Sequence, residues 1–338
     1  MKIWLDITNT PQVHFLLAIL QGLKEKGYSD FTLTARDFSE TTNLLSKKTD
    51  LPFNTIGQHK GKKLSKKAMG LISRFFEIHK SVKGYDISLS CGSEGAIWSS
   101  FLKGKRSIAF GDNDLAKQWT YAYFVSKALF PRSIPKKVLT KQGLWSNKLY
   151  QYDGLKEHVY IANFSPDSSF LSSLPFDKYV VVRPENIQSN YASGESNMSI
   201  TPSLLKLLNE KGENILYLPR YETDRMYAKG IKNIYIPNSP INGLDACYYS
   251  RGVFTGAGTF AREAACLGVP SFSFFLGKQL LAVDKSLVKQ SKMFFSRNPN
   301  ELVNHFLSSS SSAADLSKAL SVKDEVISKT VEFINVGC

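Results

Sequence analysis

Apolar residues recur along the first half of the chain in two alternating patterns. Short apolar runs typical of strands alternate with longer stretches in which apolar residues recur at helical spacing. The predicted strands are residues 2–6, 31–35, 53–56, 86–90 and 107–110. The predicted helices between them are residues 15–26, 38–48, 68–83 and 95–102. Strands separated by helices of this length predict a parallel sheet with right-handed crossovers.

The second half of the chain repeats this alternation. Its predicted strands are residues 179–183, 214–218, 234–236, 252–255 and 270–275. Its predicted helices are residues 202–211, 244–250 and 259–267. Two halves of this kind predict an α/β fold with two Rossmann-like, doubly wound parallel-sheet domains. Ligands are then expected in an interdomain cleft, at the carboxyl ends of the strands.

Interruptions of the pattern suggest where the domains end. Ser165 begins a polar stretch, Ser-Pro-Asp-Ser-Ser, in which the periodicity is lost. We therefore expect an N-terminal domain over residues 1–160 and a C-terminal domain over residues 161–320. A serine run at 308–312 precedes a last helical pattern. Residues 321–338 are expected to form a terminal helix that packs back on the first domain.

Charge is distributed unevenly between the two halves. The 338 residues carry a formal net charge of +14. Residues 1–160 hold 25 Lys and Arg against 13 Asp and Glu, whereas residues 161–338 hold 18 against 16. An excess of this size on one half favours an anionic partner there, such as a membrane surface or a polyanion. A soluble domain with a lysine-rich surface is the alternative.

Cysteine usage and the N-terminal pattern bear on the cellular compartment. The four cysteines are scattered, with no CxxC pair and no ligand-like spacing to the five histidines. This pattern favours reduced thiols over disulfides or a zinc site. The chain shows neither a signal-peptide pattern nor an apolar run long enough to span a bilayer. A cytoplasmic protein, peripheral on the inner face of the membrane if it binds lipid, is expected.

The most specific local motif joins a predicted strand to a predicted helix. Residues 252–270 read GVFTGAGTFAREAACLGVP, and their turn contains Gly256, Ala257, Gly258 and Thr259. Two glycines allow close approach of a phosphate to the backbone, and the positive end of the following helix favours the anion. Glu263 would be placed to accept hydrogen bonds from ribose hydroxyls. A plain strand-to-helix turn is the alternative.

These residues belong to a wider resemblance. The segment 255–270 and the following FLGKQLLAVD resemble the signature of the domain of unknown function 354 family, which is mainly archaeal. Further matching stretches are DITNTPQVHF from Asp6, FGDND from Phe110, QYDG from Gln151, VRPE from Val182 and LPRY from Leu218. The family is in turn similar to non-hydrolysing UDP-N-acetylglucosamine 2-epimerases and to GT-B glycosyltransferases, which implies a GT-B-like fold.

The resemblance also implies roles for residues of the second half. Arg183 and Glu185 stand in a segment that resembles the epimerases' His-Arg-Arg-Glu-Asn motif, and Arg220 in one that resembles their Pro-x-His segment. By this resemblance the two arginines would contact phosphates and Glu263 the ribose, with Glu185 in the same nucleotide-binding set. Lys278, in the loop after the next strand, is a further candidate for the diphosphate.

The epimerases' catalytic residues are not matched as a set. Their leading histidine is replaced by Val182. Their carboxylates are matched only loosely, by Glu94 after one strand and Asp112 after the next. This departure favours a transferase over an epimerase.

Candidate catalytic residues of the first half follow predicted strands. His14 begins the first helix, where several GT-B transferases place a base that deprotonates an acceptor hydroxyl, and it is equally compatible with a structural role. Asp112 and Asp114 follow a later strand. They could orient His14, bind an acceptor or ligate Mg²⁺, or form a solvated acidic loop.

A run of basic residues mixed with apolar ones spans residues 59–83. Its helical part is expected to direct Met69, Leu71, Ile72, Phe75 and Phe76 toward the core while lysines face anionic lipid. A solvated loop is the alternative. Nucleic acid is not an expected partner, because the sequence contains no recognised nucleic-acid module.

The sequence thus predicts a glycosyltransferase that moves a sugar from a nucleotide-sugar donor, such as a UDP-sugar, to a lipid-linked or glycan acceptor. No metal or other cofactor is expected to be required. A non-hydrolysing UDP-sugar 2-epimerase and a catalytically inactive nucleotide-sugar-binding protein remain open as alternatives. The base, sugar, acceptor and oligomeric state are not specified by the sequence.

Overall fold

The structure is a computed structural model that describes residues 1–338 except 39, 59–63, 188–198, 278, 311–315 and 337–338. It divides into two units, each with its own sheet. The first unit comprises Met1–Tyr160 and Leu320–Cys338, and the second comprises Ile161–Ala319.

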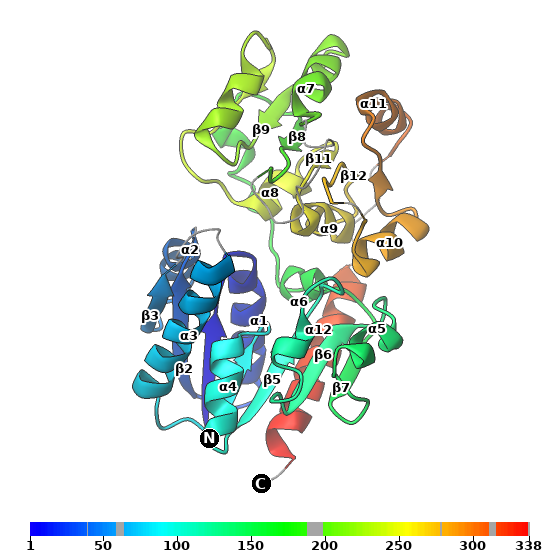
Figure 1. Cartoon of the computed structure of the whole chain (residues 1–338). Helices are drawn as coiled ribbons and strands as arrows, with labels where there is room; N and C mark the ends of the chain where they lie inside the picture. The colour runs from blue at the N-terminus through cyan, green and yellow to red at the C-terminus, as the bar shows by residue number, and fades with distance from the viewer. Residues whose placement is uncertain (39, 59–63, 188–198, 278, 311–315, 337–338) are drawn as a thin grey trace. The chain divides into compact units, whose positions relative to one another are not determined.

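The first unit is built on a seven-stranded parallel sheet (Figure 1). Its strands, in spatial order, are β3 (Phe53–Gln58), β2 (Asp30–Asp37), β1 (Lys2–Ile7), β4 (Ile87–Ser90), β5 (Arg106–Phe110), β6 (Lys127–Pro131) and β7 (Leu149–Tyr152). The order of strands reverses direction between β1 and β4. Loops leaving these two strands pass to opposite faces of the sheet, which opens a crevice at their carboxyl ends.

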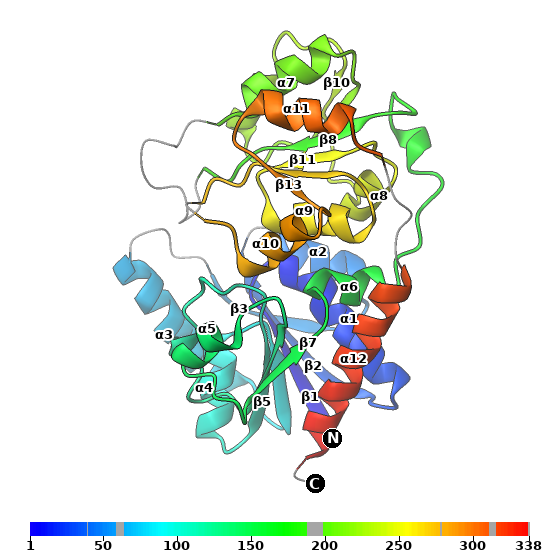
Figure 2. The same cartoon turned by 90° about the vertical axis from the view of Figure 1, so that its right-hand side faces the viewer.

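Helices cover both faces of this sheet. The helical segments of the first unit are α1 (Pro11–Glu25), α2 (Thr41–Lys48), α3 (Leu64–Ser81), α4 (Glu94–Leu102), the 3₁₀ turn η1 (Gln118–Thr120), α5 (Lys136–Lys141), α6 (Lys156–Ile161) and α12 (Leu316–Asn335). α3 and α4 lie side by side on one face, while α1 and α12 lie on the other (Figure 2).

Asp6, near the end of β1, has no exposed surface and holds the first unit together through three donors. Its Oδ1 accepts hydrogen bonds from Arg74 Nη2 of α3 at 2.6 Å and from Thr34 Oγ1 of β2 at 2.5 Å. Its Oδ2 accepts one from Ser93 Oγ at 2.5 Å. Ser93 is the N-cap of α4 and also accepts from the amide of Ala96. One buried carboxylate therefore ties β1 to β2, α3 and α4.

The orientation of α3 differs from the sequence-based expectation. Met69, Ile72 and Phe76, expected to face the core, are exposed, whereas Arg74 and Ile78 are buried. Arg74 reaches Asp6 and donates from Nε to the carbonyl of Ile56 at 2.9 Å. An unpaired buried Asp6 would be far more costly than exposed apolar groups, so the ion pair decides which side of α3 faces the sheet.

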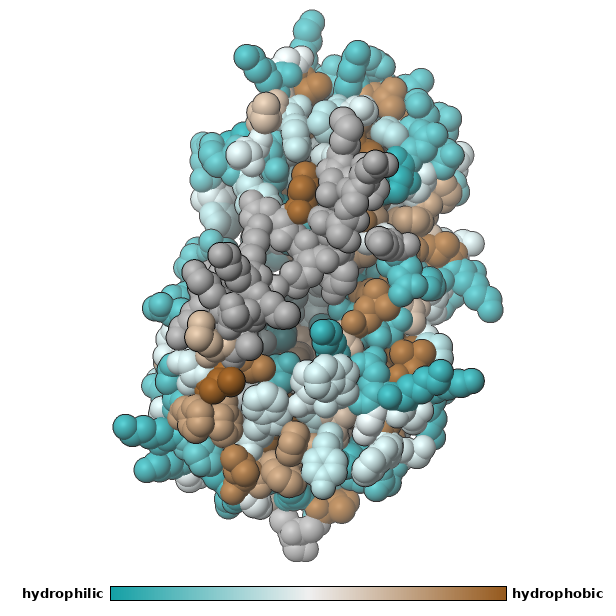
Figure 3. All heavy atoms as spheres, viewed as in Figure 1, coloured by the Kyte–Doolittle hydropathy of each residue, from teal (hydrophilic) through white to brown (hydrophobic). Residues whose placement is uncertain are grey.

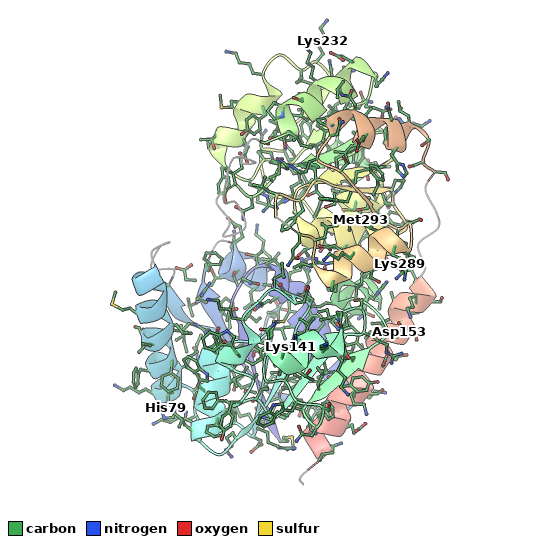
Figure 4. All side chains as sticks on the ribbon, turned by 45° about the vertical axis from the view of Figure 1, so that its right-hand side comes forward. His79, Lys141, Asp153, Lys232, Lys289 and Met293 are labelled. Atoms are coloured by element: carbon green, nitrogen blue, oxygen red, sulfur yellow. The ribbon has the colours of Figure 1, made fainter. Side chains whose placement is uncertain are left out.

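The last helix, α12, belongs almost entirely to the first unit. Glu325 accepts hydrogen bonds from Tyr150 Oη at 2.7 Å and from the amide of Asp153 at 3.2 Å. Asp153 lies beside α12 in Figure 4. Lys323 pairs with Glu25 of α1 at 3.1 Å. These contacts join α12 to β7, to the residue that follows β7 and to the end of α1.

The second unit is built on a six-stranded parallel sheet with the same type of strand order. Its strands, in spatial order, are β10 (Ile234–Tyr235), β9 (Ile215–Tyr217), β8 (Val180–Arg183), β11 (Val253–Thr255), β12 (Ser271–Ser273) and β13 (Phe294–Phe295). The reversal here falls between β8 and β11. The predicted pair of doubly wound, Rossmann-like domains is therefore confirmed.

Helices also cover both faces of the second sheet. They are the 3₁₀ segments η2 (Leu171–Ser173) and η3 (Glu222–Ala228), and the α-helices α7 (Thr201–Glu210), α8 (Gly243–Tyr248), α9 (Gly258–Cys266), α10 (Ala282–Lys289) and α11 (Pro299–Leu307). α7 and α11 pack on one face, and α8 and α9 on the other (Figure 2). Leu204 of α7, Phe306 of α11 and Phe254 of β11 share one apolar core.

Three strands of the structure are not predicted from the hydrophobic pattern of the sequence. β6, β7 and β13 are absent from the sequence-based prediction, because they are short and two of them include polar residues. Among the described residues, no helix combines the length and apolar character needed to cross a bilayer.

Replacing Asp6 by Asn is expected to lower the free energy of unfolding of the first unit by about 3–5 kcal/mol, because the buried Arg74 guanidinium loses its counter-charge. Urea unfolding followed by tryptophan fluorescence measures this unit specifically, since all four tryptophans lie in it. Asp30→Asn is the matched control. Its carboxylate is exposed and 3.9 Å from Lys2, so it should change stability by about 0.5 kcal/mol or less. Equal effects of the two substitutions would contradict the role of Asp6.

Candidate functional site

The second unit brings its candidate residues to the point where the strand order reverses. Arg183 ends β8 and is paired in register with Thr255, the last residue of β11. The amide of Gly256 donates to the carbonyl of Arg183 at 3.1 Å. Arg220 follows β9, the neighbour of β8 on its other side. Two arginines and the glycine turn therefore meet at one sheet edge.

The glycine turn has no room for a side chain at its first position. A Cβ on Gly256 would lie 2.5 Å from Cα and 2.6 Å from Cγ of Glu185. The next residue, Ala257, is the N-cap of α9 and offers no side-chain cap. Its amide donates to Thr255 Oγ1 at 2.9 Å. The positive end of α9 is therefore left without a side-chain cap, next to the turn at which Gly256 packs against Glu185.

Arg183 and Arg220 are close enough for their charges to interact. Burial, followed by the charge of Arg183, lowers the pKa of Arg220 to about 10. Burial also lowers the pKa of Arg183, which the carboxylate of Glu263 partly offsets. Arg220 Nε donates to the carbonyl of Pro184 at 2.9 Å, which holds its guanidinium in place. Two like charges held at a shared edge favour an anionic ligand between them.

α9 contributes two further side chains to this edge. The Arg183 guanidinium lies 5.6 Å from the centroid of the Phe260 ring. Glu263, three positions later on the helix, acts electrostatically on the same arginine. The buried thiol of Cys247 in α8 is affected by both charges. Burial and then the charge of Glu263 raise its pKa, whereas the charge of Arg183 lowers it. Glu263 therefore lies within electrostatic range of Arg183.

Glu185 is buried and fully engaged by the protein. Its Oε1 accepts from the amide of Ile200 at 3.0 Å and pairs with Arg297 at 2.8 Å. Its Oε2 accepts from Ser199 Oγ at 2.6 Å and from Thr201 Oγ1 at 2.8 Å. Both oxygens are therefore occupied at the start of α7. Glu185 therefore supports the Gly256 turn, and its part in nucleotide binding stays a prediction.

A buried ion pair lies against the first turn of α9. Arg262 Nη1 is 3.0 Å from Asp284 Oδ1 of α10, and its Nη2 donates to Thr259 Oγ1 at 3.3 Å. A Cβ on Gly258 would come within 3.0 Å of the same guanidinium. This ion pair packs against Gly258 and Thr259 and so holds the first turn of α9 in place. Lys278, the remaining nucleotide-binding candidate, lies outside the described residues.

His14 lies on the first turns of α1, after β1 of the first sheet. Its ring stacks on Tyr160 with centroids 5.7 Å apart. Burial, then the nearby charge of Lys48, lowers the pKa of His14 to about 4. The imidazole is therefore neutral at neutral pH.

Asp112 and Glu94 face the same buried tyrosine. Burial and then the charges of Glu94, Cys91 and Asp112 raise the pKa of Tyr121. Asp112 forms an ion pair with Lys156 of α6 at 2.9 Å. Glu94, in the first turn of α4, accepts from Thr120 Oγ1 at 3.2 Å.

Lys156 keeps its charge in spite of its burial. Burial alone would lower the pKa of Lys156, but the charges of Asp112, Cys91 and Glu157 and the hydrogen bond with Asp112 together more than offset it, so the net shift is upward. Asp114, in the same loop as Asp112, is half-buried, and its carbonyl accepts from Gln142 at 3.2 Å. Within the described part of the chain, no group of three or more His, Cys, Asp or Glu is placed to hold a metal ion.

Two polar residues at this edge were missed by the sequence reasoning. Asn9 Oδ1 and Arg36 Nε are both buried, and neither has a hydrogen-bond partner among the described residues. They follow β1 and end β2, which are paired up to Ile7 and Ala35. Burial, then the like charge of Arg74, lowers the pKa of Arg36. Asn9 comes two residues after β1, and Arg36 is the next-to-last residue of β2. A polar residue at the end of an apolar strand is the signal that could have identified them.

These features define a two-domain α/β protein of the GT-B kind, with polar residues at the reversal point of each sheet. The chain belongs to the family described as "Protein of unknown function (DUF354)", whose model matches residues 1–335. An uncharacterized protein of Methanocaldococcus jannaschii is 24% identical over 326 residues, with 90% of each chain covered.

Solved structures share the fold at low sequence identity. A UDP-GlcNAc 2-epimerase of M. jannaschii, in complex with UDP-GlcNAc and UDP, has a TM-score of 0.74 at 16% identity, with 98% of this chain and 100% of that chain covered. The Neisseria meningitidis UDP-GlcNAc 2-epimerase has a TM-score of 0.74 at 12% identity and the same coverage. The glycotransferase of kitacinnamycin has a TM-score of 0.64 at 9% identity, with 98% of each chain covered.

The depressed pKa of His14 predicts a pH-dependent contribution to stability. Between its folded value of about 4 and its ordinary value of 6.5, the unfolded chain binds more protons at this site. The free energy of unfolding should therefore fall as pH falls through this window. We expect the difference between wild type and His14→Gln, measured by urea unfolding with tryptophan fluorescence, to shrink toward pH 4 and to be constant above the window. A difference that does not change with pH would contradict the environment described for His14.

Proposed function

We propose that this chain is a glycosyltransferase that uses a nucleotide-sugar donor, with a UDP-sugar as the first candidate. The observation that carries the proposal is the coupling of Arg183 and Arg220. The like charge of Arg183 contributes to lowering the pKa of Arg220 to about 10, so an anion bound there relieves a cost already present in the folded protein. A diphosphate is negatively charged over two phosphate groups, so it can interact with both arginines.

The surrounding residues fit the remainder of a nucleotide. The amides at the start of α9 would meet a phosphate, because the Gly256 turn brings the backbone close and no side chain caps the helix. Glu263 would accept hydrogen bonds from the ribose hydroxyls. The solved structures that share the fold add support, since two of them are described as epimerases bound to UDP-GlcNAc.

In the proposed reaction an acceptor oxygen forms a bond to the anomeric carbon of the donor sugar. The bond from that carbon to the diphosphate breaks, and the acceptor's proton passes to neutral His14. The arginines and the start of α9 would stabilise the charge that develops on the leaving diphosphate, so that no metal is required. Asp112 with Lys156, Glu94 and Asp114 would line the acceptor side.

The basicity of His14 would depend on what is bound. A general base is most effective when its pKa is close to the pH of the reaction, and a pKa of about 4 is well below neutrality. Lys48 contributes to that depression. An acceptor with a phosphate or carboxylate near Lys48 would offset its charge and raise the pKa of His14. Because burial is the larger cause of the depression, an anionic acceptor, such as a lipid-linked phosphate, would restore only part of the basicity of His14.

A UDP-sugar 2-epimerase is the second candidate, favoured by the fold shared with the two epimerases. The residue that replaces their motif histidine argues against it. Val182 is completely buried in the apolar core between β8 and the helices α7 and α11. This position therefore supplies no titratable group for proton transfer at the sugar.

Substitutions at the nucleotide site test the shared binding model. Glu263→Ala and Arg220→Met should each weaken UDP binding by about 10- to 150-fold, the loss expected for one charge-assisted contact. Isothermal titration calorimetry measures this directly. Glu222→Ala, in the same unit, is the matched control, because its side chain is 87% exposed and pairs only with the neighbouring Arg225 among the described ion pairs. Unchanged affinity in Glu263→Ala would contradict the site.

Solvent exchange separates the enzymatic alternatives. In deuterated water with UDP-GlcNAc alone, a transferase should leave the sugar C2 hydrogen unexchanged, whereas an epimerase should introduce deuterium there. NMR of the recovered sugar nucleotide reads out the difference. Transfer that appears only when an acceptor is added supports the proposal, and exchange without acceptor overturns it. Tight nucleotide binding with neither reaction would point to a binding protein.

A further inference from the structure

α3 presents a stripe of apolar side chains to solvent. Met69, Ile72 and Phe76 are spaced three and four residues apart, so they lie on one side of the helix. Ile72 is 51% and Phe76 62% exposed. Side chains of this size at helical spacing normally mark the face that packs inward. Here that face looks outward.

The stripe cannot turn inward without breaking the core of the first unit. The opposite side of α3 holds Arg74, bound to Asp6 at 2.6 Å, and Ile78, which has no exposed surface. Near the end of the helix, His79 (labelled in Figure 4) approaches Ser99 of α4 with Nδ1 and Oγ 3.2 Å apart. The exposure of the stripe is therefore a fixed property of the fold.

Aromatic rings extend the stripe across α4 to the segment after β5. Ring centroids are 5.0 Å apart for Phe76 and Phe75, and 6.0 Å for Phe75 and Trp98. They are 6.4 Å apart for Trp98 and Phe124. Phe101 and Phe124 follow at 5.1 Å.

This continuous surface, which we call the α3–α4 face, has several strongly exposed members. Tyr123, whose ring centroid is 6.3 Å from that of Phe101, is 63% exposed, and Phe101 and Leu102 are exposed as well. Trp119 is also 63% exposed and precedes Thr120, whose carbonyl accepts from Trp98 Nε1. Figure 3 shows brown and tan residues gathered over α3 and α4 in the same view as Figure 1. A contiguous apolar patch of this kind on a water-facing surface marks an interaction site.

Basic residues lie on and next to the elements that form the face. Lys80 is in α3, Lys83 follows α3, Lys105 follows α4 and Lys117 precedes η1, and all four are exposed. A fifth, Lys148, lies with Nζ 5.7 Å from the centroid of the Tyr123 ring. They belong to the half of the chain that holds 25 Lys and Arg against 13 Asp and Glu. A partner that binds this face is therefore expected to present anionic groups to the lysines and apolar groups to the α3–α4 face.

We propose that the α3–α4 face docks on the surface of an anionic lipid bilayer. Phe, Ile, Leu and Met side chains would enter the boundary between headgroups and acyl chains, Trp and Tyr would lie at headgroup level, and the lysines would contact anionic headgroups. A second copy of the chain is disfavoured as the occupant, because it would bring the same lysines face to face. The proposal does not depend on the glycosyltransferase assignment.

Vesicle co-sedimentation of the full-length protein tests the proposal. Wild type should bind vesicles of equal parts phosphatidylcholine and phosphatidylglycerol and bind vesicles of phosphatidylcholine alone much more weakly. Brominated lipid should quench its tryptophan fluorescence. The double variant Ile72→Ser/Phe76→Ser should partition at least about tenfold more weakly, because two apolar side chains no longer enter the boundary. Lys80→Gln and Lys83→Gln should each weaken binding about fivefold.

The matched control removes apolar side chains of similar exposure elsewhere. Met226 and Leu307 are 70% and 49% exposed on the second unit, and Met226→Ser/Leu307→Ser should bind vesicles as wild type does. Urea unfolding establishes that each variant is folded. Calorimetric UDP binding should be the same in wild type and in Ile72→Ser/Phe76→Ser, which keeps this test independent of the proposed function.

Three outcomes would overturn the proposal. The first is that wild type does not bind anionic vesicles, and the second is that Ile72→Ser/Phe76→Ser binds them as well as wild type does. The third concerns self-association. If sedimentation velocity shows a dimer that Ile72→Ser/Phe76→Ser converts to a monomer, and vesicles are not bound, the face is an interface between copies of this chain.

Discussion

Asp6 lies near the end of the central strand β1 with no exposed surface, and a carboxylate there requires hydrogen-bond donors from the elements around it. Thr34, Arg74 and Ser93 supply them from β2, α3 and the start of α4. The same contacts fix the rotation of α3 and the first turn of α4. The exposure of Ile72 and Phe76 on the outside of the unit therefore follows from a polar contact on the inside.

The two sheets have the same type of strand order, but the charged groups at their reversal points have different environments. In the first unit a buried carboxylate is fully met by protein donors. In the second unit the charge of Arg183 disfavours the charge of Arg220, and Glu263 offsets part of the effect of burial on Arg183. A site of the first kind stabilises the fold, whereas one of the second kind is improved by an added anion. The proposed phosphate site rests on the arginines of the second unit.

Sequence reasoning succeeded where local pattern decides the structure. The alternation of strands and helices, and the glycine turn before α9, are local and were predicted. The orientation of α3 was wrong, because periodicity shows that Met69, Ile72 and Phe76 share a face but not which face the sheet covers. That choice depends on Asp6, which lies 68 residues away from Arg74 in sequence. Glu185 illustrates the same limit, since its partners Ser199, Thr201 and Arg297 come from distant segments.

The place of α12 has a consequence for how the chain is synthesised. Its contacts with Glu25, Tyr150 and Asp153 complete the first unit, yet it follows the whole of the second unit in sequence. On the ribosome the second unit can therefore close its core while the first still lacks a helix on one face. Until α12 emerges, the surface beneath it, including the position where Ile327 packs against Gly22, stays uncovered. The nascent first unit is thus the part of this protein most in need of protection from aggregation.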